Sequence, residues 1–378
     1  MTDSRNWFAD VTDSRRRRFL ASRREGVLIH VDGQVLVNFA SNDYLGLSSH
    51  EAVCMGAQGA LADGLGSGAS RLVSGDHPML HRLEEKLAAW KGYEACMIVG
   101  SGMLANLGLL QTLANRHTHI FSDRLNHASL VDGARLSGAV THRFKHLDTE
   151  QLDQLLNKHS AERRIIVSDG IFSMDGDAAN ATKLLELAEE HETLLVIDDA
   201  HGIGCMGPDA KGITASCDIA KQSRLIEVGT FGKAFGGYGA FILGNHEMIE
   251  GLRQRQRSMI YSTALPVALI TAAETALVLI QRGKERQQLQ HNLNLFKQLT
   301  AGFGFMDSGS PIQPLMVGSD EQALSLAAKL RDAGFFVPAI RPPTVPEGTA
   351  RLRFTITASH STEQIGQLTA SLKELLEK

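Results

Sequence analysis

Residues 225–237 read LIEVGTFGKAFGG and join an apolar run to a single lysine among turn-forming residues. The run Leu225–Thr230 has the length and composition of a buried strand. Lys233 follows it between Gly232 and Ala234, whereas most lysines lie on solvated surfaces among other charges. A lysine amine in crowded, water-poor surroundings can form a Schiff base with an aldehyde cofactor. This stretch therefore indicates a buried strand that presents a nucleophilic amine to a binding site.

The chain around this stretch alternates short apolar runs with amphipathic segments. The runs that we predict as strands are Cys96–Gly100, His119–Ser122, Arg164–Ser168, Leu194–Asp198, Leu225–Thr230 and Ala240–Leu243. Segments between most of them, such as Leu104–Asn115 and Ala181–His191, have helical periodicity. Strands that alternate with helices are typical of a mostly parallel, doubly wound α/β sheet, and we predict this fold class.

The two ends of the chain differ from this middle region. Residues 1–50 contain a predicted helix and a hairpin-like segment. After a long helical stretch, about Val267–Gly302, the chain reads as an α+β unit. Its predicted strands are Pro314–Val317, Phe336–Ile340 and Leu352–Thr357, and its predicted helices are Glu321–Ala333 and Thr362–Glu377. We therefore predict an N-terminal segment of residues 1–50, a large domain of residues 51–283 and a smaller C-terminal α+β domain of residues 284–378.

The composition is that of a globular protein that does not bind nucleic acid. Of 378 residues, 43% are hydrophobic and 21% are charged. The formal net charge of −4 does not indicate the excess of basic residues that nucleic-acid-binding proteins have. The four cysteines are scattered without metal-ligand spacing, which predicts reduced thiols in the cytoplasm and no metal centre. The longest apolar stretch, Val267–Ile280, is too short to span a bilayer. The N-terminal residues lack the apolar core of a signal peptide.

Candidate functional residues follow the predicted strands closely. Because the carboxyl ends of parallel strands meet at one edge of a sheet, we expect these side chains to line one site. The residues in this position are Gly100, Gly102, Met103, Asp123, His127, Ser173, Asp198, His201, Thr230 and Lys233. Their shared position is stronger evidence for a site than any single motif.

The turn Gly100-Ser101-Gly102 precedes the predicted helix and admits several interpretations. Free N–H groups and the dipole of a helix N-terminus suit a phosphate group. Gly100, Gly102 and Ala105 also fit the G-x-G-x-x-A pattern of dinucleotide-binding folds, and Asp123 lies near the position of a ribose-binding acid. From these residues alone, a nicotinamide dehydrogenase, a phosphate cradle for another cofactor and a tight turn without a ligand all remain open.

Asp198 and His201 lie three residues apart at a strand end. A carboxylate behind a pyridine ring keeps the ring nitrogen protonated through a charge-assisted hydrogen bond. Asp198 could equally cap a helix or bind a metal, and His201 could be a hydrogen-bonded core histidine. His127 could stack on an aromatic ring or cap a helix start.

Two further patterns in this region fail as motifs. Asp175 and Asp177 have the spacing of calcium ligands, but Ala179 and Asn180 occupy the next required positions of an EF-hand loop. Thr230 and Lys233 have the spacing of an S-x-x-K acyl-enzyme pair, but the chain contains no S-D-N and no K-T-G. Neither pattern therefore indicates a function.

Several arginines are candidates for binding carboxylates. Arg351 and Arg353 alternate with apolar residues as on a strand, so both point to one face. Arg341 lies in a proline-rich turn, and Arg15–Arg18 form a basic run. Arginine binds carboxylates through two parallel hydrogen bonds. Solvated arginines on a surface strand or helix face are the alternative interpretation.

Together these residues resemble the α-oxoamine synthases, which are enzymes of fold type I that depend on pyridoxal 5′-phosphate (PLP). The resemblance covers nearly the whole chain. Its motifs are SNDYLG at 41–46, IFSMDGD at 171–177, DDAHG at 198–202, IRPPTVP at 340–346 and RLR at 351–353. Within the family, the chain is most similar to the members that condense L-alanine with a pimeloyl thioester in biotin synthesis. The resemblance implies the PLP-dependent transferase fold, PLP as cofactor and an acyltransferase activity.

The resemblance also implies a role for each cofactor-site residue. Lys233 would hold the PLP aldehyde and move the substrate proton, and Asp198 would pair with the pyridine nitrogen. His127 would stack on the ring, and His201 would bind near its phenolic oxygen. The residues implied in binding the rest of the cofactor are Gly102, Met103, Ser173 and Thr230, with Ser262 or Thr263 reaching the site of a second subunit. Met103 stands where the family often has an aromatic residue, but its backbone N–H can still bind phosphate.

For the substrates, the resemblance implies that Arg353, helped by Asn42, binds the amino-acid carboxylate. Arg16, Arg341 and Thr344 would serve the acyl substrate. The family forms homodimers with a shared active site, and the acyl carrier is either coenzyme A or an acyl-carrier protein. A glycine-using relative, such as 2-amino-3-ketobutyrate ligase or 5-aminolevulinate synthase, is the main alternative function. A PLP-fold subunit without catalysis and a nicotinamide dehydrogenase are the others.

Overall fold

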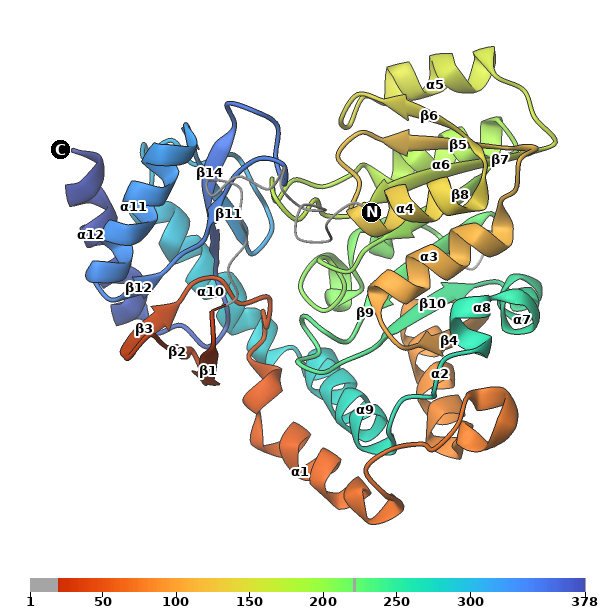
Figure 1. Cartoon of the computed structure of the whole chain (residues 1–378), viewed down its shortest axis with the longest axis horizontal. Helices are drawn as coiled ribbons and strands as arrows, with labels where there is room; N and C mark the ends of the chain where they lie inside the picture. Colours follow the sequence, from red (N-terminus) through yellow and green to blue (C-terminus); the bar gives the residue numbers. More distant parts are fainter. Residues whose placement is uncertain (1–19, 220–221, 378) are drawn as a thin grey trace, which may run out of the picture.

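The computed structural model describes residues 20–219 and 222–377. Its largest sheet has seven strands and lies in the right half of Figure 1. Its strand order is β4-β10-β9-β8-β7-β5-β6. The strands are β4 (Ala95–Val99), β5 (Thr118–Asp123), β6 (Val140–Phe144), β7 (Arg163–Asp169), β8 (Leu194–Asp198), β9 (Leu225–Thr230) and β10 (Ala240–Gly244). The strands from β9 to β6 pair in parallel, and β10 is antiparallel to both of its neighbours. The predicted mostly parallel α/β fold is confirmed.

Alternate residues of the central strands belong to two cores, one on each face of the sheet. In β8, Val196 belongs to one core, and Leu195 and Ile197 belong to the other. The first core is covered by α3 (Gly102–Leu113), α4 (Ala128–Ser137), α7 (His246–Arg255) and α8 (Arg257–Ile260). The second is covered by α2 (Pro78–Lys91), α5 (Thr149–Lys158), α6 (Ala181–Glu190) and α9 (Val267–Arg282). Because helices cover both faces, the strands read as continuous apolar runs in the sequence.

Two elements differ from the sequence-based expectation. Strand β6 was not expected, because an edge strand pairs on one side only and this one carries Thr141, His142 and Arg143 instead of an apolar run. The long helical stretch is two helices, α9 and α10 (Lys284–Leu299), because Gly283 adopts a left-handed conformation with φ of 76° between them. No helix of the described residues is long and apolar enough to cross a membrane.

Two smaller sheets involve the N-terminal and C-terminal parts of the chain. An antiparallel sheet has the order β11 (Ile312–Gly318), β14 (Ala350–Thr355) and β13 (Ala339–Ile340), and packs with α10, α11 (Asp320–Asp332) and α12 (Thr362–Leu376). The other has the order β1 (Ser22–Glu25), β2 (Leu28–Val31), β3 (Gln34–Asn38) and β12 (Phe335–Phe336). Since β12 pairs with β3, the N-terminal hairpin is joined to the C-terminal region.

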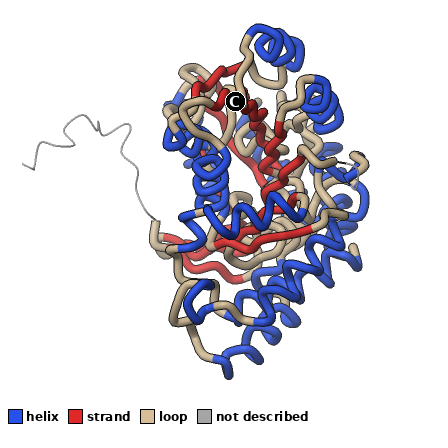
Figure 2. Tube along the Cα trace, turned by 90° about the vertical axis from the view of Figure 1, so that its right-hand side faces the viewer, coloured by secondary structure: helices blue, strands red, loops and turns tan. Residues whose placement is uncertain are grey.

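Helix α1 (Glu51–Gly59) packs on α9, and Figure 2 shows helices along the periphery with strands between them. The predicted domain boundaries stay predictions.

A buried ion pair attaches α2 to strand β9, which leads to Lys233. Lys91 Nζ lies 2.7 Å from Glu227 Oε1, and the two side chains are 1% and 0% exposed. Tyr93 and Thr214 donate hydrogen bonds to the second carboxylate oxygen, at 2.8 and 2.9 Å. Lys91 also donates to the backbone oxygen of Lys211 and to Thr214 Oγ1. Both charges are therefore fully partnered, which is the condition for burying them without a large loss of stability.

We predict that Lys91→Met lowers the free energy of unfolding by about 3–5 kcal/mol, because it leaves the Glu227 carboxylate buried without a counter-charge. Urea denaturation measures the change. The matched control is Lys183→Met, since the side chains of Lys183 and Glu186 are 46% and 58% exposed. This control should lose less than about 1 kcal/mol. Equal losses in the two variants would contradict the prediction.

Candidate active site

A cavity of about 220 Å³ lies at the carboxyl edge of the large sheet, beside Lys233. The residues that line it lie in three kinds of place: the first turn of α3, the last residues of β7, β8 and β9, and the segments that follow β5, β7, β8 and β9. The lining residues are Gly102, Met103, His127, Ser129, Asp169, Ser173, Asp198, Ala200, His201, Thr230 and Lys233. The structure thus brings together most of the predicted cofactor-site residues, from segments up to 131 positions apart between Gly102 and Lys233.

Lys233 stands in a turn that hydrogen bonds hold in shape. Thr230 Oγ1 accepts from the Gly232 N–H at 3.1 Å and donates to the Gly239 carbonyl at 3.0 Å. Gly236 has a φ of 67°, and a Cβ there would lie 2.2 Å from the Ser48 nitrogen, so only glycine fits. Burial lowers the pKa of Lys233 from 10.5 to about 8, although Asp198 and Asp169 act in the opposite direction. About a tenth of the amine is therefore unprotonated at pH 7, far more than for an ordinary lysine.

A chain of buried hydrogen bonds connects Asp198 with His127. Asn106, on α3, donates from Nδ2 to Asp198 Oδ2 at 2.6 Å and to Ser129 Oγ at 2.8 Å. Ser129 Oγ lies 2.7 Å from His127 Nδ1, and the Ser129 N–H donates to the same nitrogen at 3.3 Å. His127 is thus the N-cap of α4 and also lines the cavity. The Ala200 N–H donates to Asp198 Oδ1 at 3.1 Å, so both carboxylate oxygens have a partner.

Asp169 is a lining residue that the sequence pattern did not reveal. It ends β7 and is the register partner of Asp198 on β8, so two carboxyl groups enter the cavity side by side. Burial and the neighbouring Asp198 raise the pKa of Asp169 well above its ordinary value. Asp169 Oδ2 accepts the His127 N–H at 2.9 Å. The sequence contained a signal that was missed, because Asp169 is the last residue of its strand, as Asp123 and Asp198 are of theirs. The predicted strand ended one residue earlier, at Ser168.

A second missed residue, Tyr44, contacts His201. Its Oη lies 2.5 Å from His201 Nδ1, and the tyrosine is fully buried. Burial raises the pKa of Tyr44, and burial together with Lys233 lowers the pKa of His201 well below its ordinary value. The phenol therefore stays protonated, and its O–H donates a hydrogen bond to Nδ1 of a neutral imidazole. The ring proton of His201 is then on Nε2.

Arg353 joins three parts of the chain at the edge of this site. Its Nη2 donates to Asn42 Oδ1 at 3.1 Å, and its Nε donates to the Ser173 carbonyl at 2.5 Å. Arg353 is only 5% exposed, and its Nη1 donates to Thr355 Oγ1 at 3.0 Å. Arg353 therefore contacts Asn42, the residue expected to help it bind a carboxylate, and its strand is not a solvated surface strand.

Other predicted site residues lie outside this cavity. Ser262 donates to the Ser258 carbonyl and Thr263 bridges to Ser70, so neither lines the cavity of its own chain. Arg341 and Thr344 lie in the turn between β13 and β14, and Thr344 is exposed. Arg16 lies outside the described residues. Within residues 20–219 and 222–377, no group of three or more His, Cys, Asp or Glu side chains is placed to hold a metal ion.

We predict that acetylation of Lys233 in the cofactor-free protein reaches half its maximal rate near pH 8, because burial lowers its pKa. Exposed lysines should require a pH near 10.4. Asp198→Asn removes a carboxylate that raises this pKa, so the midpoint should move further down. Pulse labelling across a pH series with mass spectrometry of the Lys233 peptide measures both midpoints. A wild-type midpoint equal to that of exposed lysines would be the contrary result.

Known proteins resemble this chain over most of its length. The family model described as aminotransferase class I and II matches residues 34–372. The 8-amino-7-oxononanoate synthase of Saccharophagus degradans is 45% identical over 370 residues, which cover 96% of this chain and 92% of that protein. Among solved structures, the 8-amino-7-oxononanoate synthase from Francisella tularensis is 29% identical with a TM-score of 0.78, covering 90% of this chain and 98% of that one.

A serine palmitoyltransferase variant from S. paucimobilis, solved with a bound PLP–myriocin aldimine, is 27% identical with a TM-score of 0.89. That similarity covers 98% of this chain and 96% of the other. Both the sequence and the arrangement of elements are therefore shared along nearly the full length. The chain belongs to the aminotransferase class I and II family and, within it, to the family of the 8-amino-7-oxononanoate synthases.

Proposed function

We propose that this protein is a PLP-dependent acyltransferase of biotin synthesis. It condenses L-alanine with a pimeloyl thioester to give 8-amino-7-oxononanoate, carbon dioxide and the free thiol carrier. The observation that carries the proposal is the Lys233 amine, with its pKa lowered to about 8, in one cavity with the buried carboxylate of Asp198. The relatives that share this chain's sequence over most of its length carry the name 8-amino-7-oxononanoate synthase.

The groups around the cavity fit each part of PLP. The Lys233 amine suits its aldehyde, and the Asp198 carboxylate suits its pyridine nitrogen. The first turn of α3, with Gly102 and Met103, offers N–H groups that lack partners within the helix and therefore suits its phosphate, as does Thr230. We assign the face of the ring to His127 and its phenolic oxygen to the Nε2–H of His201. Ser173 completes the polar lining.

Bound PLP supplies an electron sink for the charge that develops at the substrate Cα. Asp198, held by Asn106 and the Ala200 N–H, keeps a proton on the ring nitrogen and so maintains that capacity. The Lys233 amine removes the Cα proton of alanine and later returns one, for which a pKa near neutrality is suited. Between these steps Cα bonds to the thioester carbonyl carbon, the carrier thiol leaves and the carboxylate departs as carbon dioxide.

Substrate recognition is assigned to groups at the rim of the cavity. Arg353 and Asn42, already hydrogen bonded to one another, would bind the amino-acid carboxylate. A second hollow, of about 410 Å³, lies along the turn that holds Lys233, with Asn42, Gly232 and Arg24 among its lining. We assign the approach of the longer acyl substrate to this side, with Arg341, Thr344 and Arg16 serving its distal carboxylate. Coenzyme A and acyl-carrier protein are both candidate carriers.

The proposed assembly is a homodimer with a shared active site. Several apolar side chains next to Ser262 and Thr263 are exposed in the single chain: Leu72 at 64%, Val73 at 79% and Tyr261 at 71%. The bridge between Ser70 and Thr263 joins these segments into one surface. A second copy covering it would bring Ser262 or Thr263 to the phosphate of the partner's site.

Unpaired cysteines suit a reducing compartment, and we place the reaction in the cytoplasm.

We predict that the purified protein loaded with PLP forms 8-amino-7-oxononanoate from L-alanine and pimeloyl-CoA. Glycine in place of alanine should lower kcat/KM by about tenfold, the usual size of discrimination by one methyl group. Mass spectrometry of products from alanine and glycine, each crossed with pimeloyl-CoA, acetyl-CoA and succinyl-CoA, measures the preference. A higher kcat/KM with glycine and acetyl-CoA or succinyl-CoA would replace the proposed function with that of a glycine-using relative.

We predict that Asp198→Asn still binds PLP, which borohydride fixes to Lys233, but lowers kcat by about 100-fold or more. The neutral amide does not hold the proton on the ring nitrogen, and loss of one such electrostatic contact costs this much. Peptide mapping after reduction, together with steady-state kinetics, checks both parts. Near-normal turnover, or label on another lysine, would remove the roles assigned to Asp198 and Lys233.

A further inference from the structure

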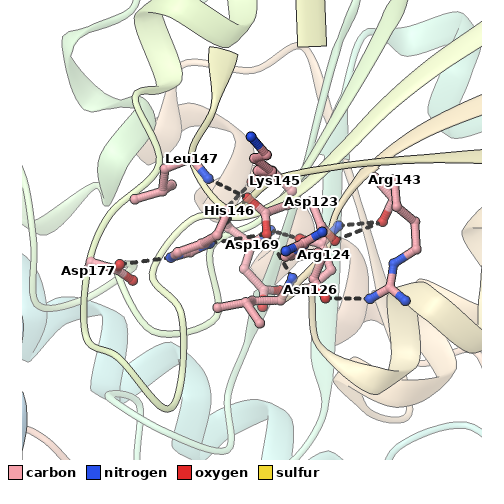
Figure 3. Close-up of polar contacts among 12 residues, drawn as sticks. Asp123, Arg124, Asn126, Arg143, Lys145, His146, Leu147, Asp169 and Asp177 are labelled. Atoms are coloured by element: carbon pink, nitrogen blue, oxygen red, sulfur yellow. Dashed lines mark hydrogen bonds and ion pairs between the residues drawn. The ribbon is translucent and has the colours of Figure 1, made fainter. Parts of the chain in front are cut away.

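His146 lies between two aspartates at the carboxyl edge of the large sheet (Figure 3). Its Nδ1 is 3.1 Å from Asp123 Oδ1, at the end of β5, and its Nε2 is 2.8 Å from Asp177 Oδ2, in the segment after β7. His146 itself follows the edge strand β6. One side chain therefore connects the carboxyl ends of three adjacent strands, β7, β5 and β6.

The aspartates hold this imidazole in its charged form. Burial lowers the pKa of His146, but the hydrogen bonds and charges of Asp123 and Asp177 outweigh it and raise the pKa to about 10. Asp123 is fully buried, and its carboxylate also accepts the N–H groups of Leu125 and Leu147, each at 2.8 Å. An imidazolium donates from both ring nitrogens at once, so it can bind two carboxylates. His146 therefore links Asp123, which is fixed to the sheet, with Asp177, which belongs to a loop.

That loop spans residues 170–179 and is a hairpin closed at its base. The Ala179 N–H donates to the Gly170 carbonyl at 2.9 Å, and the Phe172 N–H donates to the Asp177 carbonyl at 3.0 Å. His146 contacts both of its arms. Its ring lies edge-on to Phe172, with centroids 4.4 Å apart, and its Nε2 binds Asp177.

Between these two contacts, the tip of the loop binds the arginines of β14. The Ser173 carbonyl accepts from Arg353 Nε at 2.5 Å. Asp175 Oδ1 lies 2.5 Å from Arg351 Nη1, and the Met174 carbonyl accepts from the same atom at 3.3 Å. Thus the loop is fixed to the large sheet by His146 and presents its tip to Arg353, the arginine assigned to the amino-acid carboxylate.

We propose that His146 is a positioning residue for the amino-acid substrate: it clamps residues 170–179 against the ends of β5 and β6 and so fixes the Ser173 carbonyl that orients Arg353. The inference rests on the proposed function, in which Arg353 binds the carboxylate of alanine. Because the guanidinium must meet that carboxylate in a fixed geometry, loosening the loop weakens alanine binding. Lys233, which moves the Cα proton, stands after β9, and Asp198, which holds the proton of the ring nitrogen, ends β8, so neither belongs to this loop.

The test compares holoenzyme variants by spectral titration with L-alanine and by steady-state kinetics with pimeloyl-CoA. His146→Gln has N–H donors at only one end of its amide, so it cannot replace the two ring nitrogens that bind Asp123 and Asp177. Its Kd and KM for alanine should rise by about tenfold or more while kcat changes by less than about threefold. Asp177→Ala should give the same pattern. Asp177→Asn keeps an oxygen that accepts from Nε2, and its KM for alanine should return to within about threefold of the wild type.

The matched control is His191→Gln, which breaks another histidine–aspartate pair. His191 Nε2 lies 2.7 Å from Asp153 Oδ1, near the start of β8 at the opposite edge of the sheet. This variant should leave the alanine KM unchanged. Thermal unfolding is recorded for every variant. If His146→Gln does not fold, the comparison of Asp177→Ala with Asp177→Asn tests the inference instead, because the Asp177 side chain is 27% exposed and its replacement should leave the protein folded.

An unchanged alanine Kd in folded His146→Gln and Asp177→Ala would overturn the inference, as would an equal rise in the His191→Gln control. A fall in kcat with an unchanged KM would overturn it as well, because it would place His146 in the chemistry rather than in binding. A wild-type holoenzyme that does not bind L-alanine would overturn the proposed function and this inference together. The titration uses no acyl substrate, so it tests the role of His146 even if the acyl substrate is not pimeloyl.

Discussion

The buried carboxylate of Asp198 is the group on which the arrangement of the site depends. A carboxylate at the end of β8, away from water, needs donors on both oxygens, and Asn106 and the Ala200 N–H provide them. Asn106 comes from α3 and also donates to Ser129 on α4, which contacts His127. Satisfying one carboxylate therefore fixes two helices against the sheet. It also places a negative charge in the cavity that Lys233 enters, and burial of that amine has the larger effect on its pKa.

The second organising feature is the meeting of distant segments at Arg353. This side chain contacts Asn42 from the N-terminal part of the chain and the Ser173 carbonyl from the loop after β7. Tyr44, two residues after Asn42, lies against His201. The N-terminal hairpin is joined to the C-terminal region through the pairing of β3 with β12, so these contacts are part of one framework. The edge of the cavity at Arg353 is thus built from parts of the chain that no local motif connects.

Most of the large sheet could be predicted from the sequence, because strands buried on both faces leave long apolar runs. Strands β8 and β9 were predicted with the bounds that the structure has. Strand β6 was missed because its Thr141, His142 and Arg143 do not form such a run. The boundary at Asp169 was placed one residue early for a related reason, since a polar residue ends the apolar pattern although its backbone still pairs with β8.

The sequence by itself determined the parallel α/β fold, the placement of Lys233 after a buried strand and most of the residues that line its cavity, because residues that follow parallel strands must gather at one edge. Only the tertiary structure decided which polar side chains support them. Asn106 and His146 lie in no sequence pattern that predicts a site. Tyr44 lies in the SNDYLG motif and Asp169 ends a strand, but neither position shows which side chain it contacts. Their roles come from contacts across 23 to 157 positions of sequence, and such contacts depend on how the elements pack rather than on any local spacing.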